Sequence, residues 1–151
     1  MAVLIGLGAF LGMGFYFAPL TGGRSLDFIF TEAGLRAAIE GFSDADIARH
    51  VYGTRVLDMG FPLLYGAAIA LVLMRYHQAN KLTKLLLLLG IGVAADFMEN
   101  IYNLDLLAGG EMFTIHLVFT WVKFACLSLP LYFALQPFLK EASAKMRRQN
   151  L

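Results

Sequence analysis

Residues 85–104 read LLLLLGIGVAADFMENIYNL, an apolar run that carries two carboxylates in its second half. A helix rises about 1.5 Å per residue, so about 20 such residues cross a hydrocarbon core about 30 Å thick. Backbone polar groups find no water there, and a continuous apolar run favours a helix over the strands of a barrel. The stretch therefore predicts a membrane-spanning helix that contains charge.

Three further stretches are long and apolar enough to span a membrane: residues 1–20, 55–74 and 112–136. Residues 1–20 carry no charge and lack the basic start of a secretory signal, so we expect a retained span. Short links make the last three spans antiparallel neighbours. We expect an all-α fold, an integral membrane four-helix bundle in which residues 1–151 form a single domain.

Composition excludes several other classes of protein. The 151 residues are 59% apolar and 15% charged, with a mean hydropathy of +0.68, whereas soluble domains carry roughly a quarter charged residues. A net charge of +1 provides no basic surface for nucleic acid. The single cysteine, Cys126, excludes an internal disulfide and a cysteine-based zinc site.

The long segment between the first two spans also shows helical signals. Leu35, Ile39 and Phe42 recur at helical spacing, and Ser43 stands before acidic residues as a helix N-cap does. We expect a helical segment over 31–53 that covers the outer mouth of the bundle. Seven Lys and Arg lie in the second loop and after the last span, against four in the outer segment, so we expect both termini in the cytoplasm.

Polar side chains interrupt the last three spans on matching stripes. An unpaired charge at the centre of a span costs roughly 2.5 to 3.5 kcal/mol, so such residues turn inward and find partners. The residues of this expected polar column are Asp58, Asp96, Glu99, Asn103, His116, Thr120 and Lys123. From the midplane outward, the rise per residue pairs Asp96 with Lys123, Glu99 with Thr120, and Asn103 and Asp58 with His116.

The column has a functional and a structural interpretation. Asp96 and Lys123 could relay a proton or ion or act as a charged anchor for a substrate, or they could form a structural ion pair that fixes helix register. Glu99 could act as a general acid or base beside a histidine. Pro62 could only shape its helix, or it could open a pocket lined by Pro62, Tyr65 and Asn100.

The sequence favours no cofactor and no metal ion. A haem with two histidine ligands would need His50 and His116 at one depth, and no cluster has metal-ligand spacing on one helix. The expected partners are membrane lipid and a lipophilic ligand or a partner transmembrane helix.

Short motifs over about residues 43–127 resemble a family of small four-span bacterial integral membrane proteins. The motifs are Asp58 with Phe61-Pro62 and Tyr65, then Asp96 with Glu99-Asn100, and later Thr120 with Lys123. The resemblance implies that the protein lies in a bacterial cytoplasmic (inner) membrane, and it implies no particular activity. In architecture the chain is also similar to the sterol-isomerase and sigma-2-receptor-like family, in which acidic residues near a proline face a lipophilic pocket, as Asp58 and Pro62 would.

Our leading hypothesis is a non-enzymatic membrane protein whose polar column stabilises the bundle and lines a site for a lipophilic ligand or a partner helix. The first alternative is a membrane enzyme that acts on a lipid or isoprenoid, with a buried carboxylate as acid or base. The second is proton or ion conduction by an oligomer, since four spans without an inverted repeat make transport by one chain unfavourable.

Overall fold

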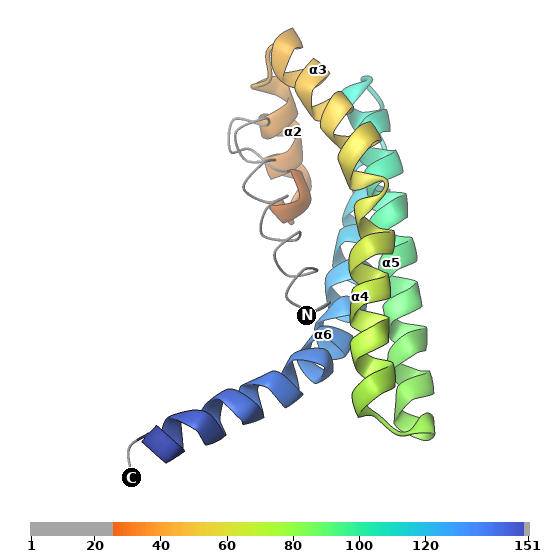
Figure 1. The fold of residues 1–151 in the computed structure, drawn as a ribbon. Coiled ribbons are helices and arrows are strands. Elements are labelled where there is room, and N and C mark those ends of the chain that lie inside the picture. Colours follow the sequence, from red (N-terminus) through yellow and green to blue (C-terminus); the bar gives the residue numbers. More distant parts are fainter. Residues whose placement is uncertain (1–25, 150–151) are drawn as a thin grey trace.

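The structure is a computed structural model that describes residues 26–149, with the side chains of 26–147. Its elements are η1 (Leu26–Phe28), α2 (Glu32–Glu40), α3 (Asp44–Gly53), η2 (Thr54–Asp58), α4 (Phe61–Tyr76), α5 (Ala79–Leu107) and α6 (Phe113–Gln149). Every one of these elements is helical, which confirms the all-α class for the described part of the chain (Figure 1). The expected span over 1–20 lies outside the described residues.

Three helical stretches are long and apolar enough to cross a membrane: Asp44–Tyr76, Ala79–Leu107 and Phe113–Arg147. They contain nearly all of the three predicted spans at 55–74, 85–104 and 112–136. Each stretch is longer than its prediction because the predicted windows were matched to the hydrocarbon core, whereas the helices continue through polar flanking residues.

The helices expected over 31–53 are present as α2 and α3. Thr31 caps α2 by accepting a hydrogen bond from the Gly34 N–H at 3.2 Å. Ser43 and Asp46 form a capping box at the start of α3, with each side chain accepting from the other's backbone N–H. The difference from the prediction is that α3 runs directly into η2, so the outer segment is continuous with the second membrane-length stretch.

The second span is not one regular helix with a proline in its interior. A π-helical turn, η2, ends at Asp58, and α4 begins at Phe61 with Pro62 in its first turn. A proline there removes an N–H that would have no partner within the helix in any case. Pro62 therefore starts a helix instead of kinking one.

Helices α5 and α6 lie side by side and are joined by a tight turn (Figure 1). Gly109 has a φ of +89° in this turn, which a residue with a side chain adopts only under strain. Farther along, a Cβ on Gly92 would lie 2.6 Å from Leu127 Cδ2. The two helices thus approach each other at a position where only glycine fits.

Two apolar clusters enclose the middle of the bundle. The outer cluster joins η1, α2 and the ends of α5 and α6 that meet at their turn, and its buried residues are Leu26, Leu35, Leu106, Leu107 and Phe113. The inner cluster lies at the opposite end of α5, and its buried residues are Val72, Leu73, Leu85, Leu89 and Ala134. The positions on α5 between these clusters hold most of its polar residues.

Where it packs on the inner cluster, α6 begins to turn away from α4 and α5 (Figure 1). This part of α6 contains Pro130 and Pro137. Pro137 has no N–H for the carbonyl of Phe133, and His77 Nε2 lies 3.2 Å from that oxygen. Because a carbonyl can only accept, Nε2 carries the hydrogen. His77 therefore supplies the hydrogen bond that Pro137 removes from the helix.

We expect His77→Phe to lower the free energy of unfolding by about 1–2 kcal/mol, because the Phe133 carbonyl loses its donor in a partly buried place. A phenyl ring can keep the edge contact that His77 makes with the Phe133 ring. Thermal unfolding of the purified protein in detergent micelles measures the change. His77→Gln, which retains a donor, is the control and should recover part of the loss. Equal stability of the His77→Phe variant and the parent would contradict this role.

Candidate functional site

Lys123 is the centre of the buried polar column. Its Nζ lies 3.3 Å from Asp96 Oδ1, and it also pairs with Glu99 Oε2. The side chains of Lys123, Asp96 and Glu99 are only 8%, 13% and 0% exposed. The predicted pairing of Asp96 with Lys123 is therefore present, but the ammonium is also shared with Glu99, a pairing that was not predicted.

Each of the two carboxylates has a second partner. The Tyr65 hydroxyl, from α4, donates to Asp96 Oδ2 at 2.7 Å. The Thr120 hydroxyl, from α6, lies 2.7 Å from Glu99 Oε1, as their predicted common level requires, and 3.1 Å from the carbonyl of His116. Three helices therefore meet at these two carboxylates.

His116 and Asn103 form the next layer outward, as predicted. His116 Nε2 lies 2.8 Å from Asn103 Oδ1, and because an amide oxygen only accepts, Nε2 carries the hydrogen. The same nitrogen lies 4.0 Å from Glu99 Oε1. Among the described residues, His116 Nδ1 has no hydrogen-bond partner although the side chain is fully buried. This layer connects the histidine to Glu99 and leaves one ring nitrogen available.

Asp27, which was not among the predicted residues, extends the column outward. Asn103 Nδ2 donates to Asp27 Oδ1 at 3.4 Å. The aromatic residues that follow hold η1 against α6: Phe28 packs on Phe124 and Phe30 on Trp121, with ring centroids 6.1 and 5.1 Å apart. The sequence does contain a sign of this contact, because Asp27 is the one acid in the apolar run LDFIF (residues 26–30) and a buried charge needs a partner.

Asp58 does not join His116 as predicted. Its backbone carbonyl accepts a hydrogen bond from Asn100 Nδ2 at 3.1 Å, and its carboxylate interacts electrostatically with Asp27, Asp96 and Glu99. The depth estimate assumed a regular helix through residue 58, whereas the wider π turn of η2 changes the direction of its side chains. Asp58 thus belongs to the charged cluster, but at a different place in it.

The predicted pocket residues separate into two sets. An apolar groove of about 280 Å³ runs between α4 and α5, lined by Pro62, Leu63, Gly66, Ala67, Ala70, Leu86, Leu89, Gly90 and Val93. Pro62 lines this groove, whereas Tyr65 and Asn100 do not, because they make hydrogen bonds to Asp96 and Asp58 within the protein. The groove therefore shares none of its lining residues with the column.

The two histidines considered as haem ligands have other surroundings. His50 is buried in α3 and stacks on Phe42, with ring centroids 4.6 Å apart, while His116 is bonded to Asn103. Within residues 26–147, no group of three or more His, Cys, Asp or Glu side chains could hold a metal ion.

These features define a helical protein with three helices of membrane-spanning length around a buried ion-pair cluster. Comparison of the chain with known protein families, with curated proteins and with solved structures gives no match.

Proposed function

We propose that the chain is a multi-pass, non-enzymatic protein of a bacterial cytoplasmic membrane that binds a lipophilic molecule in the groove between α4 and α5. Both termini lie on the cytoplasmic side, where the larger number of basic residues is expected. The polar column holds the helices in register while the groove receives the ligand. The observation that carries this proposal is an exposed groove lined only by apolar residues.

The shape of the groove supports an extended apolar ligand. Gly90 and Ala67 are exposed in the groove, and a Cβ on Gly90 would meet nothing within 4 Å. Such small residues let an acyl or isoprenoid chain lie against the helix backbones. Gly66 approaches Val93 on the same seam, where an added Cβ would lie 2.8 Å from a Val93 methyl carbon. The contact of α4 with α5 therefore keeps the groove in a fixed shape beside the column.

Photolabelling with a diazirine-bearing phospholipid tests the groove. In the full-length protein reconstituted in vesicles, we expect labelling concentrated on 62–70 and 86–93. Gly90→Leu fills the groove without a steric clash and should reduce that labelling several-fold while leaving thermal stability unchanged. Leu87→Phe, at a position 66% exposed that does not line the groove, is the matched control. Uniform labelling of all lipid-facing residues, or labelling indifferent to Gly90→Leu, would refute the site.

Proton exchange is a second candidate function, favoured by the balance of charge in the column. Asp96 and Glu99 share one ammonium and Asp58 adds a further acid to the cluster, so negative charge is left over unless protons or other cations are held. An uncompensated charge is costly in a low-dielectric interior. His116, with one ring nitrogen unpartnered among the described residues, lies next to Glu99. Hydrogen bonds and ion pairs connect the cluster from Tyr65 to Asp27.

If the column holds an exchangeable proton, the infrared difference spectrum between acidic and alkaline samples should show the band of a protonated carboxyl group. Glu99→Gln should remove or shift this band, while Glu141→Gln, at an exposed position outside the cluster, should leave it in place. A spectrum without a carboxyl band in the parent protein would exclude proton exchange and leave the column with a structural role.

A further inference from the structure

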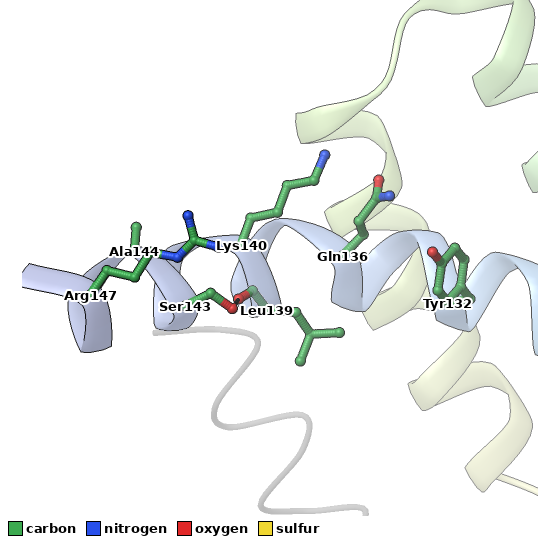
Figure 2. Close-up of a pocket in the computed structure, with 7 residues that line it drawn as sticks. All are labelled: Tyr132, Gln136, Leu139, Lys140, Ser143, Ala144 and Arg147. Carbon is green, nitrogen blue, oxygen red and sulfur yellow. Dashed lines mark hydrogen bonds between the residues drawn. The ribbon is translucent and has the colours of Figure 1, made fainter.

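The C-terminal part of α6 carries a row of polar and basic side chains on one face. Figure 2 shows the seven residues along the helix, and together they line a shallow groove of about 450 Å³. We name this row the basic stripe: Tyr132, Gln136, Leu139, Lys140, Ser143, Ala144 and Arg147. These residues recur at intervals of three or four, so they share one broad side of the helix, with Gln136 and Lys140 toward one edge of it and Leu139 and Ser143 toward the other (Figure 2).

Within residues 26–147, the charged side chains of the stripe form no ion pair, in contrast to the lysine beside them. Lys145, outside the stripe, forms an ion pair with Glu141 at 3.0 Å. Among the described residues, no carboxylate lies within ion-pair distance of Lys140 or Arg147. Gln136 adds an amide donor between the charges and the bundle. Ser143 is different, because its hydroxyl already donates to the Leu139 carbonyl at 2.8 Å.

The position of the stripe brings it to the boundary of the apolar region. The apolar part of α6 packs on the inner cluster up to Phe138, and the helix then continues outside the bundle (Figure 1). Leu139 and Met146 are each 60% exposed there, beside the basic side chains. Tyr132, at the bundle end of the stripe, is the kind of residue that is enriched where hydrocarbon meets headgroups.

We propose that the basic stripe binds the phosphate groups of anionic phospholipids at the membrane surface. The inference rests on the membrane placement proposed above and is independent of the groove between α4 and α5. Lys140 and Arg147 supply the charge, Gln136 and Tyr132 supply neutral donors, and Leu139 contacts the acyl chains. Charge complementarity favours an anionic lipid headgroup as the partner. A second copy of the chain is disfavoured, because two copies of this basic face would repel each other.

Native mass spectrometry of the full-length protein in detergent with equal amounts of phosphatidylglycerol and phosphatidylcholine tests the stripe. We expect the parent protein to retain phosphatidylglycerol preferentially. Lys140→Gln with Arg147→Gln should weaken this retention about tenfold, since each basic residue near a membrane surface contributes measurably to anionic lipid binding. Arg75→Gln with Lys84→Gln removes one arginine and one lysine at exposed positions outside the stripe and should leave retention nearly unchanged.

Three results would overturn the inference. Equal retention of both lipids by the parent shows that no anionic headgroup is recognised. An equal loss in both double variants assigns retention to net charge and not to the stripe. Full displacement by free glycerol phosphate assigns the site to a soluble phosphate. If any of these results is obtained while the groove between α4 and α5 is still photolabelled, the proposed function stands and only lipid binding by the stripe is refuted.

Discussion

Lys123→Met is expected to lower the free energy of unfolding by about 3–5 kcal/mol, because removal of one partner leaves buried charge without compensation. The loss is large here because Asp96 and Glu99 share this one ammonium. Among the described side chains, the only other basic group within ion-pair distance of either acid is His116, 4.0 Å from Glu99. Chemical unfolding of the purified protein in detergent, followed by Trp121 fluorescence, measures the change.

Neutralisation of both acids should rescue this variant. Lys123→Met combined with Asp96→Asn and Glu99→Gln removes all three charges and should recover most of the lost stability. Asp96→Asn alone should cost little, because Lys123 and Glu99 remain as a balanced pair and the amide oxygen can still accept from Tyr65. Lys84→Met, at an exposed position, is the control. A Lys123→Met protein as stable as the parent would show that the cluster does not hold the bundle together.

Gly92→Val is expected to lower the free energy of unfolding by about 3 kcal/mol, the upper end of the usual cost of overpacking. The added Cβ meets Leu127 Cδ2 at 2.6 Å and the Leu127 backbone nitrogen at 3.3 Å, so a rotamer change cannot relieve the whole clash. The helices α5 and α6 must then separate, which also lengthens the contacts of Lys123.

Gly90→Val is the matched control for this prediction. Gly90 is on the same helix, and a Cβ there would meet nothing within 4 Å. Both variants replace a glycine of α5 by valine, so the change in helix propensity is the same in each. The difference between their melting temperatures in detergent therefore measures the contact of α5 with α6. Equal melting temperatures would mean that the two helices do not depend on close approach at Gly92.

The helices and the centre of the column could be predicted from the sequence because both follow from local rules. Apolar length predicted the three membrane-length helices, and helical spacing placed Asp96 and Glu99 on one stripe of α5. The antiparallel return of the chain then placed Lys123 and Thr120 at matching depths. These inferences need only the rise of a helix and the cost of buried charge.

The remaining features depend on tertiary packing or on irregular backbone. Asp27 reaches the column because the aromatic residues after it bring η1 onto α6, and no helical period encodes that contact. Asp58 was misplaced because a π turn ends at it, and Pro62 was misread because it starts α4. His77 lies far in sequence from Phe133, so its hydrogen bond to that carbonyl could not be foreseen.

Two acids of α5 share the one ammonium of α6, and this arrangement affects how the chain is inserted into the membrane. The last apolar segment, taken alone, would carry an unpaired lysine into the lipid, at a cost of about 3 kcal/mol on insertion scales. Both of its counter-charges lie on the segment made just before it, across the tight turn at Gly109. We expect these two segments to leave the translocon together as a hairpin, with the ion pairs already formed when they enter the bilayer.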